Sequence, residues 1–189
     1  MYFLLFNLFL LAAIIFLFLC LSMVWPPDSP WAPWWRTSSK IARAICRLAK
    51  VKKNDKVYDL GSGDGTALLI AASEFDATGI GIEIDPLRAI FSKIRIKASK
   101  LSGKISIKRK NFFNVKINDA TVIFVYLVPK ELLRLREKFM NELTPGTRIV
   151  SYRYAIPYLP LIKKDEVHGL YLYIIPEKIR KKSKARNKV

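Results

Sequence analysis

The chain has 189 residues, which is the length of one ordinary domain, and a formal net charge of +18. Its two cysteines, Cys20 and Cys46, stand far apart in sequence, which argues against a disulfide framework and against a metal site; no metal is predicted. The large positive charge indicates an anionic partner, and an anionic lipid surface or a nucleic acid would each satisfy it.

Residues 1–25 are predicted to form a retained transmembrane anchor, because no charged residue lies between Met1 and Val24 and the run is long enough to span a bilayer. Nothing basic precedes the run and no small-residue cleavage site follows it, so a secretory signal is disfavoured. Basic residues follow it. The positive-inside rule therefore predicts a single-pass membrane protein with its N-terminus outside and the rest of the chain in the cytoplasm or the organellar equivalent.

Three further segments are predicted. Residues 26–37 are a linker and lead-in rich in Trp and Pro, residues 38–176 form one folded domain, and residues 177–189 are a basic tail. The stretch KIRKKSKARNKV in this tail contains no acidic residue. It is predicted to contact an anionic membrane surface, which is compatible with a disordered, solvated tail.

Helical and strand patterns alternate along the folded domain. Helices are predicted over 38–50, 66–75, 87–101 and 130–143. Strands are predicted over 56–60, 78–84, 104–108, 120–128, 148–154 and 170–175. This order predicts an α/β fold of the Rossmann-like type, with a mostly parallel twisted sheet and helices on both faces. Ligands bind such sheets beyond the carboxyl ends of the strands.

A glycine-rich turn follows the first strand in the stretch VYDLGSGDGT. Gly61, Gly63 and Gly65 alternate with other residues, and Asp59 precedes them by two positions. Dinucleotide folds use a different spacing, G-x-G-x-x-G, and place a pyrophosphate there. A carboxylate suits a ligand with a positive charge better, and Glu83 at the end of the second strand can accept hydrogen bonds from ribose hydroxyls. The combination predicts a methyltransferase that binds S-adenosyl-L-methionine.

Five stretches of the domain, VYDLGSGDG, GIEIDP, KNFFNV, ATVIFVYLVP and GTRIVSYRYAIP, resemble the small class I (seven-β-strand) protein-lysine methyltransferases. That family includes broad-specificity archaeal enzymes and the membrane-anchored mitochondrial enzymes that methylate the ATP synthase c-subunit and the adenine nucleotide translocase. The preceding stretch PWWRTSSKIARAICRLAKV is similar to the family's lead-in and helix. Two departures stand out, because Arg36 replaces a lead-in proline and Thr66 replaces an arginine common after the glycines.

The resemblance implies roles for individual residues. Asp59 and the three glycines would hold the methionine end of the cofactor, and Glu83 the ribose. Asn111 and Phe112 would border the adenine, and Thr37 would fold over the cofactor. The implied substrate is a lysine side chain of a membrane or membrane-associated protein.

A lysine amine has a pKa of about 10.4 and must lose a proton before it attacks a methyl group. Burial near a sulfonium would lower that pKa, and aromatic rings would guide the ammonium into the site. Trp34 and Tyr126 are the candidates for a substrate-lysine channel, with Tyr152 and Tyr154 as further possibilities. His168, the only histidine, is predicted to have a surface or structural role.

Three other functions stay open. A lipid or quinone methyltransferase is compatible with the predicted anchor and the tryptophans. An RNA methyltransferase is compatible with the charge, but the stretch after the fourth strand, Tyr126-Leu-Val-Pro129, lacks the Asn-Pro-Pro-aromatic motif used on base amines. Nucleic acid is therefore not the favoured partner. A membrane-tethered adaptor without activity would require that no cofactor binds.

Overall fold

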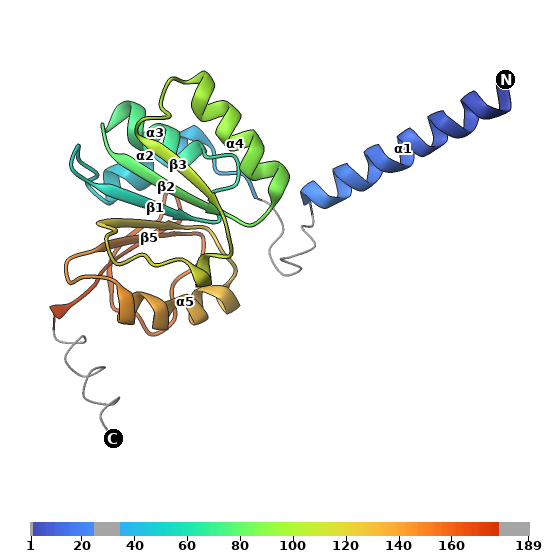
Figure 1. Cartoon of the computed structure of the whole chain (residues 1–189). Helices are drawn as coiled ribbons and strands as arrows, with labels where there is room; N and C mark the ends of the chain where they lie inside the picture. Colours follow the sequence, from blue (N-terminus) through green and yellow to red (C-terminus); the bar gives the residue numbers. More distant parts are fainter. Residues whose placement is uncertain (1, 25–34, 178–189) are drawn as a thin grey trace. The chain divides into compact units, whose positions relative to one another are not determined.

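The computed structural model describes residues 2–24 and 35–177 (Figure 1). The chain divides into two compact units, one that ends at Trp35 and one that begins at Arg36. Of the predicted segments, Trp34, most of the Trp/Pro-rich linker and the tail beyond Glu177 lie outside the described residues.

The described residues of the first unit include the helix α1, over Tyr2–Val24. Its large apolar side chains between Tyr2 and Phe18 are exposed, with Phe9 at 72%. The Asn7 amide is the polar exception, and it donates to the Phe3 carbonyl one turn earlier, at 2.7 Å.

The predicted membrane anchor is corrected by the structure. Over the described residues, no helix is long and apolar enough to cross a membrane. This finding contradicts the single-pass topology with the N-terminus outside and the catalytic domain in the cytoplasm, so that predicted localisation is wrong.

The second unit is built on one seven-stranded sheet with the order β3-β2-β1-β4-β5-β7-β6. The strands are β1 (Lys56–Leu60), β2 (Thr78–Glu83), β3 (Ile105–Arg109), β4 (Val122–Val125), β5 (Arg148–Tyr152), β6 (Leu161–Asp165) and β7 (Leu170–Ile174). Strands β1 to β5 are parallel, whereas β7 is antiparallel to β5 and to β6. The chain runs outward from β1 to β3 and then returns to place β4 beside β1. The end of β1 therefore lies where the strand order reverses, which is the usual ligand position in such sheets.

Helices cover both faces of the sheet (Figure 1). They are α2 (Ser39–Leu48), α3 (Thr66–Glu74), α4 (Pro86–Ala98) and α5 (Pro129–Glu142), with a short 3₁₀ helix, η1 (Phe112–Asn114). The first three pack on one face in an apolar core rich in alanine, and α5 packs on the other through Leu132, Leu135 and Phe139. Burial of these residues, at about 25 cal/mol per Å² of apolar surface, is the main stabilising contribution.

The predicted Rossmann-like fold is confirmed, and the predicted helices agree with the observed ones to within a few residues. The Ser38 side chain caps α2 by accepting from the Ile41 N–H, and the Asp85 side chain caps α4 by accepting from the Arg88 N–H. Two strands differ. Strand β4 is shorter than the predicted 120–128, and the edge strand β6 was not predicted.

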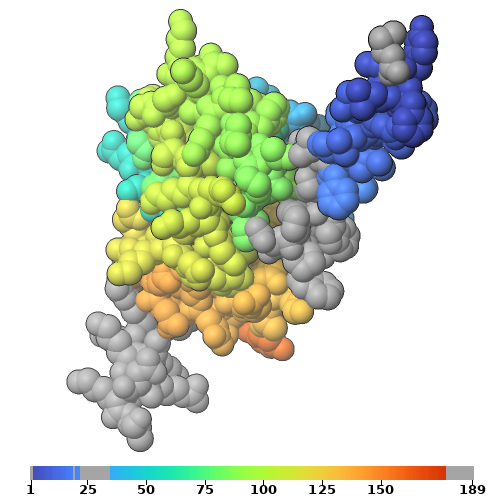
Figure 2. Space-filling view, turned by 45° about the vertical axis from the view of Figure 1, so that its right-hand side comes forward, coloured from blue at the N-terminus to red at the C-terminus, as the bar shows by residue number. Residues whose placement is uncertain are grey.

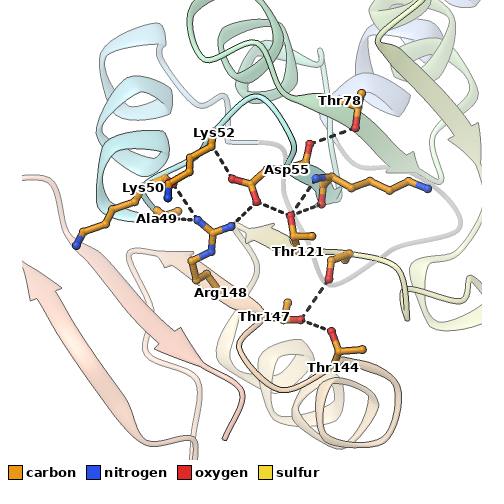
Figure 3. Close-up of polar contacts among 11 residues, drawn as sticks. Ala49, Lys50, Lys52, Asp55, Thr78, Thr121, Thr144, Thr147 and Arg148 are labelled. Carbon is orange, nitrogen blue, oxygen red and sulfur yellow. Dashed lines mark hydrogen bonds and ion pairs between the residues drawn. The ribbon is translucent and has the colours of Figure 1, made fainter.

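A polar network joins the amino ends of the parallel strands (Figure 3). It lies at the opposite side of the sheet from the glycine turn, which follows the carboxyl end of β1. Arg148 at the start of β5 pairs with Asp55 and donates to the Ala49 and Lys50 carbonyls at the end of α2, at 2.7 and 2.9 Å. Asp55 also accepts from the Thr121 hydroxyl at 2.7 Å. The network therefore fixes the C-terminal end of α2 at the amino ends of the strands. The N-terminal end of α2 consequently points toward the carboxyl ends of the strands.

Candidate active site

The glycine turn leaves β1 and leads into α3. Gly61, Gly63 and Gly65 have positive φ angles of 88°, 52° and 76°, which an L side chain rarely adopts. The N–H groups of Gly61 and Ser62 both donate to the Ile82 carbonyl of β2, at 2.8 and 3.1 Å. This fixes the turn over the ends of β1 and β2 with its backbone bare.

The two carboxyl groups predicted from the sequence lie beside this turn. Glu83 ends β2, and its two oxygens accept from the Gly63 and Asp85 N–H groups at 2.7 and 2.9 Å. Burial raises the pKa of Glu83, and these two backbone bonds oppose the rise. Each oxygen keeps further lone pairs, so the carboxylate can still accept from a ligand hydroxyl.

Asp59 is buried near the end of β1. No donor among the described residues forms a hydrogen bond with its side chain. Burial, and then the negative charges of Glu83 and Asp64, raise the pKa of Asp59 to about 7. A buried carboxyl without a donor is costly unless a cation or donor joins it. The cationic methionine end of S-adenosylmethionine would meet this need, so the residues present fit that cofactor.

A third carboxylate, Asp64, links the turn to two distant segments. Its Oδ2 pairs with Arg36 Nε at 2.7 Å and with Arg95 Nη1 at 2.8 Å, and its Oδ1 accepts from the Thr66 hydroxyl at 2.7 Å. Arg36 and Thr66 are the two departures from the family pattern noted in the sequence. The structure shows that both bind the same carboxylate.

The packing of the turn also requires a residue without a side chain in the neighbouring strand. The buried Ser62 side chain faces Gly81 of β2. A Cβ built on Gly81 would lie 2.6 Å from Ser62 Oγ and 2.5 Å from Ile107 Cδ1. Gly81 is thus part of the turn's packing, a role that sequence spacing did not indicate.

Asn111 and Phe112 follow β3 at the same edge of the sheet. Asn111 is exposed and its side-chain oxygen accepts from the Phe113 N–H at 3.0 Å, which caps η1. Phe112 is half-buried and packs against Phe113 with ring centroids 4.7 Å apart. In Figure 2 the yellow-green stretch that contains these residues lies at the surface between α4 and α5.

An aromatic pair lies at the ends of β4 and β5. The Tyr126 and Tyr152 ring centroids are 4.5 Å apart. The guanidinium of Arg153 lies 6.0 Å from the Tyr126 centroid and 5.6 Å from the Tyr152 centroid. Arg153 has a positive φ of 66°, uncommon outside glycine, and the Ser151 hydroxyl closes its turn by donating to the Tyr154 carbonyl at 2.6 Å. Sequence reasoning did not identify Arg153.

Thr37 and His168 are the other described residues for which the sequence predicted a role. Thr37 is half-buried in the segment before α2. His168 lies in the turn between β6 and β7, where its Nδ1 lies 2.8 Å from Asp165 Oδ2. Over the described residues, no group of three or more His, Cys, Asp and Glu side chains is placed to hold a metal ion.

A doubly covered sheet with a bare, carboxylate-flanked turn at the end of β1 defines a Rossmann-like methyltransferase that uses S-adenosyl-L-methionine. The chain belongs to the family described as the ANTKMT methyltransferase domain, which it matches over residues 59–163.

Three named relatives are protein-lysine methyltransferases. The Protein-lysine N-methyltransferase of Saccharolobus islandicus (strain REY15A) is 36% identical over 162 aligned residues, and the match covers 82% of this chain and 99% of the relative. The mouse Adenine nucleotide translocase lysine N-methyltransferase is 31% identical over 54% of this chain and 44% of its own length. The human lysine N-methyltransferase of the ATP synthase C subunit is 24% identical over 67% of this chain and 53% of its own length. The chain therefore spans about half of these two mammalian relatives.

A similar solved structure is described as an RNA methyltransferase from Salinibacter ruber in complex with S-adenosyl-L-homocysteine. It has a TM-score of 0.74 and 31% identity, and the match covers 76% of this chain and 95% of that one. The methyltransferase yhhF from Escherichia coli, with a TM-score of 0.63 and 15% identity, shares the fold.

Proposed function

We propose that this methyltransferase transfers the methyl group of S-adenosyl-L-methionine to the side-chain amine of a lysine in a protein. The observation that carries the lysine assignment is the Tyr126–Tyr152 pair, which already has a cation, the Arg153 guanidinium, over both rings. An ammonium is attracted to aromatic faces in the same way. The names of the relatives agree with this substrate.

The cofactor supplies an activated methyl group on a sulfonium, and the chain's residues position it. In our proposal Asp59, Gly61, Gly63 and Gly65 hold the methionine end, because the buried carboxyl has no other donor among the described residues. Glu83 accepts from the ribose hydroxyls. Asn111 and Phe112 border the adenine, and Thr37 closes over the cofactor from the lead-in.

The lysine ammonium must lose its proton in the site before the amine can attack the methyl group. Arg153 is exposed, and its positive charge beside the tyrosines would join the sulfonium in lowering the pKa of an ammonium held there. Alignment of the amine with the methyl group can then supply several kcal/mol of the rate enhancement. Tyr126 is the proposed channel residue among those described, and Trp34, the second predicted one, lies outside them.

The test offers three acceptors separately to the full chain with methyl-labelled cofactor: lysine-containing peptides, total RNA and phospholipid vesicles. Label in lysine, shown by mass spectrometry of the peptides, supports the proposal. Tyr126→Ala should raise KM for the peptide about tenfold through loss of the cation–π contact. Tyr126→Phe keeps the ring and is the matched control. Label in RNA or lipid alone would refute lysine as the acceptor.

A finer form of the proposal is that the substrate protein is membrane-associated and that the basic tail contacts an anionic surface. It is supported by the net charge of +18 and by the basic stretch near the C-terminus. Co-sedimentation of the chain with phosphatidylserine vesicles, with and without residues 178–189, tests the second part. Equal sedimentation of both forms would count against it.

RNA methylation is the second candidate, favoured by the similar structure that is described as an RNA methyltransferase. Against it, β4 is followed by Tyr126-Leu127-Val128-Pro129, which lacks the Asn-Pro-Pro-aromatic motif. A lipid or quinone acceptor has no support of this kind from the described residues. The three-acceptor experiment separates these functions.

A further inference from the structure

A groove with a volume of about 570 Å³ lies between α2 and β6, outside the predicted cofactor and lysine-channel residues. Lys40, Arg43 and Arg47 line it from α2, and Lys163 and Lys164 line it from β6. We call it the α2–β6 groove. Its lining also includes Asp165 and Glu166 at one end, so it has five basic and two acidic side chains.

Two of the five basic side chains are paired inside the domain. Arg43 binds Glu74 at 2.8 Å, and Lys164 binds Glu166 at 3.1 Å. Among the described residues, Lys40, Arg47 and Lys163 have no ion-pair partner, and all three are exposed. The groove therefore has three positive charges without an ion-pair partner among the described residues, and an anionic partner would pair with them.

Strand pairing places one end of the groove at the edge of the sheet where the lysine channel is proposed. Asp165, at the end of β6, is in register with Leu170 of β7, and Leu170 is in register with Tyr152 of β5. On the other wall, α2 begins two residues after Thr37. A polypeptide with its lysine at the Tyr126–Tyr152 pair could therefore continue into the groove.

The mixed charge of the groove favours a protein segment over a nucleic acid. A phosphate backbone is uniformly negative and would meet the carboxylates of Asp165 and Glu166. Single-stranded nucleic acids are also held by stacking on aromatic rings, and apart from the imidazole of His168 no ring lines the groove. A segment with several acidic residues can place them on the lysines and arginines and avoid the two carboxylates.

We propose that the α2–β6 groove docks an acidic segment that flanks the methylated lysine in the protein substrate. This inference rests on the proposed lysine-methylating function. The distance from Lys40 to Arg47 along α2 is about 10 Å at 1.5 Å per residue. An extended segment of about three residues spans it.

The test compares two peptides with the same lysine, one flanked by Asp and Glu and one by Asn and Gln. For the full chain, the acidic peptide should have about tenfold lower KM with similar kcat, and the difference should shrink at high salt. The combined variant Lys40→Glu, Arg47→Glu and Lys163→Glu should remove this preference. The matched control, with the same change of charge on another surface, is Lys93→Glu, Lys97→Glu and Lys116→Glu.

Fluorescence anisotropy of the labelled acidic peptide gives a second readout that does not require methyl transfer. Equal KM and equal affinity for both peptides, or equal effects of the two triple variants, would overturn the groove proposal while lysine methylation stands. A different outcome is that the acidic peptide binds in the groove but its lysine acquires no label. That result would refute the proposed lysine methylation, whereas the groove would still be a docking surface. If the groove variant loses affinity for total RNA but not for the acidic peptide, the groove is a nucleic-acid surface and the inference fails.

Discussion

In the proposed cofactor site, the ionisation of Asp59 sets how cofactor binding should depend on pH. Burial, with the charges of Glu83 and Asp64, raises its pKa to about 7, so the carboxyl is neutral in weakly acidic solution. A cationic ligand binds the ionised form and lowers that pKa, so binding below the raised pKa must release a proton. In the cofactor-free protein, the raised pKa of Asp59 also makes the free energy of unfolding depend on pH. The contribution of Asp59 to stability is fully present below its unfolded pKa of 3.8 and is lost as the pH rises through about 7.

We therefore predict that the affinity for S-adenosylmethionine rises between about pH 5 and pH 7 by as much as tenfold per unit, and then levels off. Calorimetry at about pH 6 in two buffers of different ionisation enthalpy should show proton release. Asp59→Asn should bind weakly and release no proton. An affinity for the unaltered chain that stays flat over this range would contradict the assignment.

Gly81 lies where the turn packs on β2, and its substitution should disturb both stability and cofactor binding. Gly81→Ala places a methyl group 2.6 Å from Ser62 Oγ and 2.9 Å from Ser62 Cβ. Overpacking of this kind costs about 1–3 kcal/mol. The measurements are denaturant unfolding and calorimetry with S-adenosylhomocysteine.

The matched control is Gly103→Ala, because a Cβ there meets nothing within 4 Å. Its free energy of unfolding should change by less than about 0.5 kcal/mol. Equal behaviour of the two variants would show that the contact between Ser62 and Gly81 does not constrain the turn.

The positions of some residues of the candidate site could be predicted from local sequence, and those of others could not. Asp59, the glycines and Glu83 follow directly from strand ends, where short-range spacing and ligand chemistry coincide. Arg153 was missed because its position over Tyr126 depends on a left-handed backbone conformation and on the neighbouring strand. The meeting of Arg36 and Thr66 at Asp64 joins segments far apart in sequence, which spacing does not reveal.

At the scale of elements, the segment before α2 is tied to the glycine turn through Arg36 and Asp64, at 2.7 Å. We predict that Arg36→Ala weakens S-adenosylmethionine binding about fivefold with little change in unfolding free energy, because the Arg36 side chain is 62% exposed. The measurement is calorimetric affinity together with thermal unfolding.

Two further variants refine that experiment. Arg36→Lys keeps the charge and should recover part of the affinity. Arg95→Ala removes the more buried partner of Asp64 and should weaken binding and stability together. If Arg36→Ala leaves the affinity unchanged, the lead-in does not contribute to the cofactor site through this pair.

The network at the amino ends of the strands should matter for stability and not for chemistry (Figure 3). Arg148→Ala leaves the buried carboxylate of Asp55 without its ion pair and frees two carbonyls at the end of α2. We expect a loss of about 3 kcal/mol in unfolding free energy, measured by urea denaturation.

The comparison variant is Lys53→Ala, whose partner Asp76 lies at the surface and whose own side chain is 80% exposed. Loss of such a pair costs about 0–1 kcal/mol. Similar losses for the two variants would show that the Arg148 network is no stronger than a surface ion pair.

Among the elements, strong amphipathic or wholly buried patterns were predictable, and β6 was not. Its sequence, LIKKD, places exposed residues at four of five positions, so it lacks the alternation that marks a half-buried strand. An edge strand of this kind forms because β7 offers it a partner, which is a tertiary effect. Strand β4 was predicted too long because the residues around it are apolar but belong to loops.

At the scale of the whole molecule, the order of strands was predictable only in part. Alternating strands and helices predict a parallel sheet with right-handed crossovers, and this holds for β1 to β5. Strand β7 lies between β5 and β6. Either strand of this hairpin could have paired with β5, and the local sequence pattern does not distinguish the two arrangements. The predicted membrane span was wrong by the criterion of length and apolarity over the described residues.

The position of β7 between β5 and the edge strand β6 has a consequence for how the protein is made. Strand β5 obtains its outer neighbour only when Leu170–Ile174 is available, and β6 cannot join the sheet before then. A nascent chain emerging from the ribosome would therefore expose the apolar edge of β5 until nearly the whole domain had been synthesised. Completion of the sheet is thus a late event in the synthesis of this domain, and the interval before it is when the exposed edge of β5 is most open to aggregation.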